Sequence, residues 1–426
     1  MAAASSEAVV QAMATLKEAK KTGVAWLNHN RYAHDTATLV GKEGPTKIHA
    51  GKLRLYVAAS VPLHHSDGWG FMARACDAMF KGDWPNAIHL GYYAELRAAM
   101  SLLAAEGIGV LNRTHVCLDR RGGVRLVENI STHRFVWAAL DSWTRRPTSL
   151  SAVLSSIAVA SRPLTDWLSS AGSPAQLHQL LVGKWLRAWS LDIRRMAEDR
   201  NLRNRASYRP SGVRGCQRAG FTNCMTPIAD VWRSCEPSVG GSFPNLDRHL
   251  LRLALDQSYR ALKGSRRVGP AFERYIDRSL AVVGDQGLRP FLLRQESPDD
   301  SQLLRWASKA GGPDSPQPVL ARATILLRLA SAVTASLLRA AAFDRDELRF
   351  WWEPYGLNHG LWDFGGEPEE FTDLWADVEA PLQVVEQFGG GEEPGTSSIA
   401  SLWSRLSDSL VPLSQCERVA LWSIGV

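Results

Sequence analysis

Arginine residues concentrate in one part of the chain, residues 184–218. This stretch carries ten basic and three acidic residues, a net charge of +7 in a chain whose total is +6. Its centre, residues 200–210, reads Arg-Asn-Leu-Arg-Asn-Arg-Ala-Ser-Tyr-Arg-Pro. The planar guanidinium group can donate paired hydrogen bonds to phosphate oxygens, so the composition favours phosphate binding. A solvated basic face without any ligand is the alternative that the sequence leaves open.

A helix is expected to position these arginines. Between residues 176 and 209 apolar side chains recur three to five positions apart, which gives an α-helix one broad apolar stripe. The members of the stripe are Leu177, Leu181, Trp185, Ala188, Ile193 and Met196. We expect this stripe to face a core and the arginine-rich end of the helix to be open to solvent.

Two more helices are predicted upstream, in residues 70–107. Apolar residues keep helical spacing on both sides of Gly82 and Asp83, and Pro85 suits the first turn of the second helix. Gly107 can supply a left-handed cap at its end. The short connection predicts a tight helical hairpin.

This hairpin carries a resemblance to a known family. Residues 75–108 resemble the first helical hairpin of HEPN domains, which are four- to five-helix bundles common in bacterial toxins and antiphage systems. Arg113-Thr114-His115 resembles the short Lys/Arg-Thr-His stretch that often follows that hairpin. The hallmark of the family is Arg-polar-x-x-x-His late in the bundle, and residues 203–208 read Arg-Asn-Arg-Ala-Ser-Tyr. The resemblance covers residues 70–210, and Tyr208 stands where the family has histidine.

The resemblance implies a bundle that dimerises and cleaves RNA without metal, through attack of the 2′-hydroxyl on the phosphate. It assigns catalytic roles to Arg203, Asn204 and Tyr208. The neighbouring Arg200, Arg205 and Arg209 are candidates for nucleic-acid binding. Arginine can stabilise the phosphate in the transition state and asparagine can orient it. Tyrosine, with an ordinary pKa of about 10, is poorly suited to act as a general base near neutral pH. Two alternatives therefore stay open: a metal-independent endoribonuclease, and a bundle that binds without cleaving.

The spacing along the whole chain predicts a mainly α protein with two helical bodies. We expect an N-terminal extension (1–69), an HEPN-like bundle with an insertion (70–210), a connector (211–244) and a Trp-rich helical domain (245–426). Residues 52–62 alternate like a short strand, and the connector is punctuated by Gly, Pro and Ser. Residues 319–342 form the most apolar segment, which should be the buried centre of the second helical domain.

An aromatic cluster in residues 350–362 could stack nucleobases. It contains Phe350, Trp351, Trp352, Tyr355 and Trp362. No lysine or arginine interleaves these aromatics, and acidic residues follow them, which would repel a nucleic-acid backbone. A core cap or a surface for a protein partner is the favoured interpretation.

Other chemistries lack a matching pattern. The six cysteines show no paired-ligand spacing for zinc, and the chain has no Gly-rich phosphate loop with lysine, no Gly-x-Ser-x-Gly and no His-Glu-x-x-His. We expect neither a metal nor a cofactor. The N-terminus lacks the pattern of a signal peptide, and Arg328 and Arg339 interrupt the longest apolar segment, so a soluble cytoplasmic protein without a membrane partner is expected.

The leading hypothesis is a component of a bacterial antiphage-defence or toxin-type system that binds RNA or a nucleotide, with cleavage as one version. The alternative is a non-catalytic adaptor that forms a homodimer or binds other subunits of a defence complex. A helical regulator that binds DNA is less favoured, because no helix-turn-helix pattern with base-reading side chains is visible.

Overall fold

The computed structural model describes residues 4–20, 26–43, 47–146, 150–173, 175–208, 221–238, 241–264, 269–284, 286–294, 301–391 and 399–425. Helices make up most of these residues, which confirms the predicted mainly α class. The helices of the first half are α1 (Ser6–Lys20), α2 (Thr36–Glu43), α3 (Ala50–Phe80), α4 (Trp84–Ala105), α5 (Thr132–Thr144), α6 (Ser151–Ser156), α7 (Leu164–Ser170), α8 (Ala175–Ala188) and α9 (Ile193–Tyr208).

The second half continues with helices of very different lengths. They are α10 (Phe221–Cys235), α11 (Pro244–Lys263), α12 (Pro270–Val283), α13 (Arg289–Leu293), α14 (Gln302–Ser308), α15 (Gln317–Ala340), α16 (Arg349–Asn358), α17 (Ala376–Gly391), α18 (Ile399–Ser414) and α19 (Glu417–Trp422). Short 3-10 helices also occur in the described residues of this half: η3 (Gln286–Leu288), η4 (Asp346–Leu348) and η5 (Phe371–Trp375).

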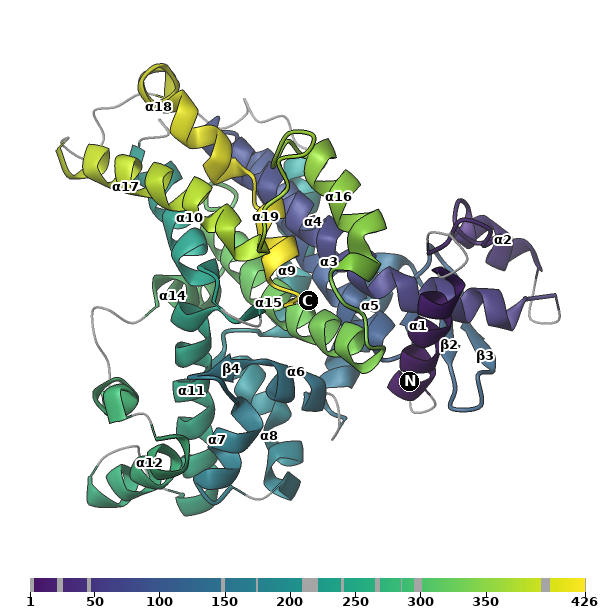
Figure 1. Ribbon diagram of the computed structural model, residues 1–426, viewed down its shortest axis with the longest axis horizontal. Helices are drawn as coiled ribbons and strands as arrows, with labels where there is room; N and C mark the ends of the chain where they lie inside the picture. The colour runs from purple at the N-terminus through teal and green to yellow at the C-terminus, as the bar shows by residue number, and fades with distance from the viewer. Residues whose placement is uncertain are drawn as a thin grey trace.

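The strands are short and lie between helices of the first half. β1 (Ile108–Gly109), β2 (His115–Leu118) and β3 (Val124–Val127) form an antiparallel sheet in that order, with His115 opposite Val127. β4 (Ala158–Val159) and β5 (Arg162–Pro163) form a second antiparallel pair. In Figure 1, β2 and β3 lie beside α1 and α2, whereas α7, α8, α11 and α12 gather in another part of the molecule.

The α3–α4 hairpin is present as predicted, but α3 starts much earlier than expected. The predicted strand at residues 52–62 is wrong, because these residues belong to α3. Leu53 and Val57 are buried one helical turn apart, so their alternation with Leu55 also fits a helix. The ring of His49 caps the helix by accepting a hydrogen bond from the amide of Lys52.

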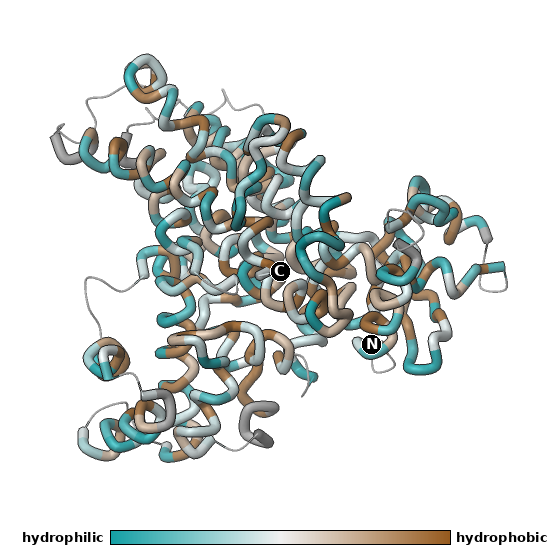
Figure 2. Tube along the Cα trace, viewed as in Figure 1, coloured by the Kyte–Doolittle hydropathy of each residue, from teal (hydrophilic) through white to brown (hydrophobic). Residues whose placement is uncertain are grey.

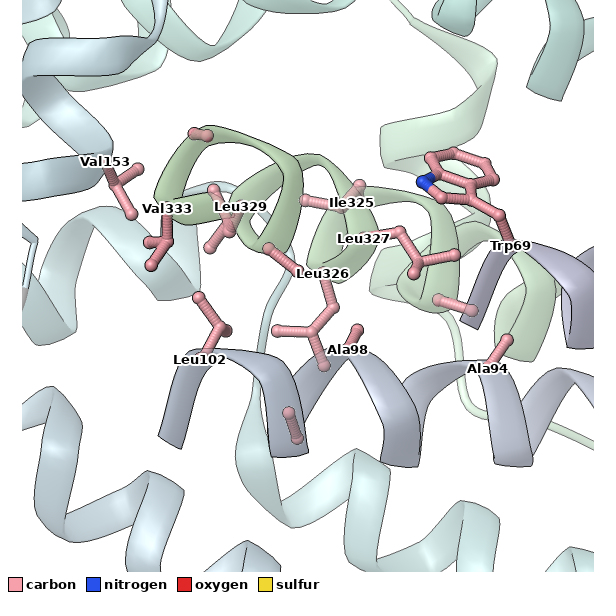
Figure 3. Packing of buried hydrophobic residues seen from close by; sticks show 14 of the residues in the cluster. Trp69, Ala94, Ala98, Leu102, Val153, Ile325, Leu326, Leu327, Leu329 and Val333 are labelled. Atoms are coloured by element: carbon pink, nitrogen blue, oxygen red, sulfur yellow. The ribbon is translucent and has the colours of Figure 1, made fainter. Parts of the chain in front are cut away.

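The apolar helix α15 is the structural centre and packs along α4 and α3. Figure 3 shows Leu326, Leu327 and Leu329 of α15 close to side chains of the hairpin. Glycine allows this close approach: a Cβ atom on Gly68 would lie 2.6 Å from Leu327 Cδ2. α15 is long and apolar enough to cross a bilayer, but 94% of its most apolar window is buried inside the fold, as in the core helix of a soluble protein.

The buried residues of both predicted bodies join one hydrophobic cluster. Peripheral helices carry both hydrophilic and hydrophobic residues along their length, as amphipathic helices do (Figure 2). The predicted domain boundaries stay a prediction.

Two segments differ from what the spacing predicted. The single helix expected over residues 176–209 is two helices, because the backbone turns between α8 and α9 at Ser190, whose φ is +62°. Part of the predicted connector is the helix α10, which carries Cys224 and Cys235 in buried positions. Pro227 lies inside α10. Because proline usually ends or kinks a helix, the sequence did not indicate a helix here. Cys216 lies outside the described residues.

Candidate functional site

A buried ion pair fixes the helix that carries the predicted site. Asp199 of α9 accepts two hydrogen bonds from Arg322 of α15, each 2.7 Å long. The Nη1 atom of Arg322 also donates to the carbonyls of Ala307 (2.9 Å) and Lys309 (2.8 Å). The result is a rigid anchor, one helical turn before Arg203, that ties α9 to the core.

A second carboxyl group lies against this ion pair. Glu95 of α4 is fully buried, and its Oε1 atom lies 3.6 Å from Arg322 Nε. Burial, and then the charge of Asp199, raise the pKa of Glu95 well above its ordinary value. Burial also raises the pKa of Asp199, but the charge of Arg322 and its two direct hydrogen bonds favour the ionised form of Asp199. We therefore expect Glu95 to be the neutral member of the trio and Asp199 to carry the charge that balances Arg322.

Arg203 lies one turn further along α9, and the partners that the described residues offer it are neutral. Its Nη2 atom donates to the Tyr93 hydroxyl (2.7 Å) and lies 3.1 Å from His133 Nε2, and its Nη1 atom donates to Asn204 Oδ1 (2.9 Å). The guanidinium carbon is 5.7 Å and 5.1 Å from the ring centroids of Tyr92 and Tyr93. We call these five residues (Tyr92, Tyr93, His133, Arg203 and Asn204) the Arg203 cluster.

The Nε nitrogen of Arg203 has no hydrogen-bond partner among the described residues, and this atom is buried. A buried donor without an acceptor costs roughly 1–3 kcal/mol. Arg203 therefore has a spare donor as well as an uncompensated charge, although only 9% of its surface is exposed.

The contact with Arg203 fixes the tautomer of His133. A guanidinium group can only donate, so His133 Nε2 must accept and Nδ1 must carry the hydrogen. Nδ1 then donates to the Tyr92 hydroxyl (2.9 Å), which also accepts from Trp137 Nε1 (3.3 Å). Burial, with the charges of Arg203 and Arg200, lowers the pKa of His133, so its ring is neutral.

His89 of α4 lies next to Tyr93 of the Arg203 cluster, with the two ring centroids 5.0 Å apart. Its Nδ1 atom lies 2.8 Å from Ser207 Oγ, and that hydroxyl donates its own hydrogen to the Arg203 carbonyl (2.9 Å). His89 Nδ1 must therefore be the donor, which leaves the lone pair of Nε2 able to accept a proton. Burial and then the charge of Arg203 lower the pKa of His89, so this ring is also neutral near pH 7.

The predicted site residues are only partly brought together. Arg203 and Asn204 are hydrogen-bonded, but Arg203 is buried rather than open to solvent as expected. Tyr208 is the last residue of α9 and 80% exposed, and within the described ranges it has no hydrogen bond to Arg203. Arg200 is half-buried and Arg205 is exposed, whereas Arg209 lies outside the described residues.

The sequence reasoning missed the partners of Arg203. Tyr93 and His89 are four residues apart in α4, and His133 is in the first turn of α5, so tertiary packing alone joins them to α9. The only local signal was the run of aromatic and histidine residues on one face of α4.

Further basic side chains line a pocket between α5, α8 and α9. This pocket has a volume of about 560 Å³, and Arg145, Arg187 and Arg194 contribute to its wall. Arg145 is paired with Asp141 at 2.5 Å. Arg187 and Arg194 belong to the arginine-rich stretch of the sequence, and Asp192 also lines the pocket, so the lining keeps only a small net positive charge.

Metal ligands are not grouped in the described parts of the chain: no set of three or more histidine, cysteine or acidic side chains there could hold an ion. Comparison with known proteins found no match among family models, curated proteins or solved structures. The HEPN resemblance therefore depends on the motif residues themselves.

Proposed function

We propose that this protein binds RNA at the Arg203 cluster and is a cytoplasmic component of a bacterial antiphage-defence or toxin-type system, as the HEPN resemblance implies. The observation that carries the proposal is the buried Nε donor of Arg203, which lacks an acceptor among the described residues. A phosphate oxygen would supply that acceptor.

Because the partners of Arg203 are neutral, a phosphate could replace one of them as a hydrogen-bond acceptor. Tyr93 and Asn204 offer uncharged oxygens, so a phosphate that replaces either one converts an ordinary hydrogen bond into a charge-assisted one. The exposed Arg205 and the arginines of the pocket between α5, α8 and α9 would attract the rest of the RNA backbone.

His89 is the residue we propose for proton transfer in a cleaving enzyme, in the role that the family gives to the hallmark histidine. The 2′-oxygen would attack phosphorus while His89 Nε2 takes the hydroxyl proton. The bond to the 5′-oxygen would break, and that oxygen would take a proton from water. Arg203 would stabilise the added negative charge on the phosphate, so the reaction needs no metal.

The test uses a fluorescent single-stranded RNA, with binding measured by anisotropy and cleavage measured on gels in the presence of EDTA. We expect Arg203→Ala to weaken binding at least about tenfold and to reduce the slope of log K against log salt by about 0.7, the effect of one lost phosphate contact. Arg274→Ala, an exposed arginine of α12, is the matched control and should bind normally.

His89→Gln separates the two steps. It should lower the cleavage rate by about 10²-fold or more and leave binding within a few fold, because the general base contributes only to the reaction. His29→Gln, at an exposed histidine, is its control. The proposal is overturned if RNA does not bind, or if Arg203→Ala binds RNA as tightly as the unaltered protein. RNA that binds but is not cleaved would remove the catalytic part alone.

A non-catalytic adaptor is the second candidate, and one exposed side chain favours it. Phe364 is 92% exposed in the loop after α16, next to the exposed Asp363 and Gly365. A lone exposed phenylalanine with acidic neighbours suits a protein interface better than a nucleic-acid surface. If RNA does not bind and Phe364→Ser abolishes a homodimer or releases other defence subunits, the adaptor role replaces the first proposal.

A further inference from the structure

A pocket of about 460 Å³ lies beside the Arg203 cluster and shares Tyr93 and His133 with it. Its walls come from α3, α4, the start of α5 and the turn that leads into α2. The volume is within the range of roughly 300–1,000 Å³ that is typical of small-molecule sites. The contacts of the Arg203 cluster described above do not require a pocket of this size beside it.

One wall of the pocket suits a flat aromatic ligand. Phe71 and Tyr93 are stacked, with ring centroids 5.3 Å apart and planes at 22°. Tyr56 also contributes to the lining, and Leu96 and Met100 add apolar surface. Aromatic walls of this kind contribute roughly 1–3 kcal/mol for each stacked nucleobase.

The polar groups of the pocket offer both donors and acceptors. His64 Nδ1 accepts from Arg97 Nη1 (2.9 Å), so the hydrogen of its neutral ring is on Nε2. Burial and then the charge of Arg97 lower the pKa of His64 to about 3, so the ring stays neutral. The exposed amide of Asn112 adds a donor and an acceptor at the rim. Arg97 itself is paired with Asp67 at 3.4 Å.

We infer that this pocket binds a nucleobase, with the phosphate of the same nucleotide at the Arg203 cluster. A base held against the ring of Tyr56 and the edges of Phe71 and Tyr93 would lie near the neutral ring of His64 and the amide of Asn112. The Tyr93 hydroxyl would join the base to the phosphate contact. The phosphate half of this inference rests on the proposed function, whereas the base half rests on the pocket alone. The nucleotide can be a free molecule or one residue of an RNA strand.

The test compares four classes of ligand by calorimetry: the four common nucleosides, their 5′-monophosphates, ribose 5-phosphate, and single-stranded RNA homopolymers. We expect at least one monophosphate to bind about tenfold or more tightly than ribose 5-phosphate, and its nucleoside to bind measurably. Asn112→Trp, which fills the rim of the pocket, should weaken the binding of that nucleoside and of that monophosphate about tenfold or more. Gln383→Trp, at an exposed residue of α17, is the control and should leave both unchanged.

The two possible sources of the base give different results. Preference for the homopolymer of the same base supports a residue of RNA, and tight binding of the monophosphate with no homopolymer preference supports a free nucleotide. The inference is overturned if every monophosphate binds no better than ribose 5-phosphate, or if Asn112→Trp has no effect.

The outcomes also separate this inference from the proposed function. Loss of RNA binding in Arg203→Ala, with no effect of Asn112→Trp, would leave the proposed function and remove the base pocket. Loss of nucleoside binding in Asn112→Trp, with no effect of Arg203→Ala on RNA binding, would leave the base pocket and remove the proposed function. Asn112 is exposed, so we expect both of its variants, Asn112→Trp and the milder Asn112→Ala, to unfold within a few degrees of the unaltered protein in a thermal melt.

Discussion

Arg203 of α9 and Arg322 of α15, which contacts α9, are both buried. The two arginines differ in the charge of their partners. Arg322 is fully buried and is neutralised by Asp199, with backbone carbonyls on its remaining donors. Among the described residues, Arg203 has a hydroxyl, an imidazole and an amide as partners, none of them charged, and its Nε atom has no acceptor. A buried arginine paired with a carboxylate cannot be removed without leaving a buried charge, whereas a positive charge held by neutral groups attracts an anion.

Removal of the two guanidinium groups in turn is the strongest test of this contrast. We expect Arg322→Leu to lower the free energy of unfolding by about 3–5 kcal/mol, because Asp199 would be left as an uncompensated buried charge. Arg203→Leu should cost only about 1–2 kcal/mol, since its partners are neutral and can turn to water or to each other. Urea unfolding followed by circular dichroism measures both values. Equal losses would mean that Arg203 is a structural residue like Arg322.

The neutral state of Glu95 gives a smaller effect that depends on pH. Its raised pKa means that the folded protein keeps a proton that the unfolded chain releases above about pH 4.3. The stability contributed by Glu95 is therefore complete at low pH and declines as the pH rises towards the folded pKa. In Glu95→Gln this decline is absent.

Thermal unfolding between pH 5 and pH 9 measures the difference. The variant should gain stability relative to the unaltered protein as the pH rises, with a difference within about 1 kcal/mol at the acidic end. Glu379→Gln, at an exposed carboxylate of α17, should show no such trend. A constant difference at every pH would mean that Glu95 is ionised in the fold and that Arg322 balances two charges.

The smallest effect is expected at the exposed end of α9. Tyr208→Phe removes only a hydroxyl from a side chain that is 80% exposed, so it should change the free energy of unfolding by less than about 0.5 kcal/mol. RNA cleavage should change less than twofold if His89 takes the proton. A loss of cleavage in Tyr208→Phe comparable to that in His89→Gln would return the catalytic role to the hallmark position.

The sequence was a good guide to elements whose burial follows one helical face. The second part of α3, the helix α4 and the helix α15 were expected near their observed positions, because their apolar residues recur with helical spacing. The early part of α3 and the helix α10 were not expected. Each contains a proline, and tertiary packing supports the helix despite the lost hydrogen bond.

The site was predictable only where it is local to α9. Arg203 and Asn204 are adjacent in the chain, so a motif could point to both of them. The partners Tyr93 and His133 are 110 and 70 residues away from Arg203 in sequence, and only the packing of α4 and α5 on α9 brings them there. No spacing in a single sequence contains that information.

The two buried arginines of α15 also bear on the order in which the protein can form during synthesis. Arg322 pairs with Asp199, made 123 residues earlier, and Arg328 pairs with Asp247, made 81 residues earlier. Until α15 leaves the ribosome, α9 and α11 each carry an acidic side chain that their final environment would not tolerate alone. The core around α9, which holds Arg203 in place, can therefore be completed only after α15 has been synthesised.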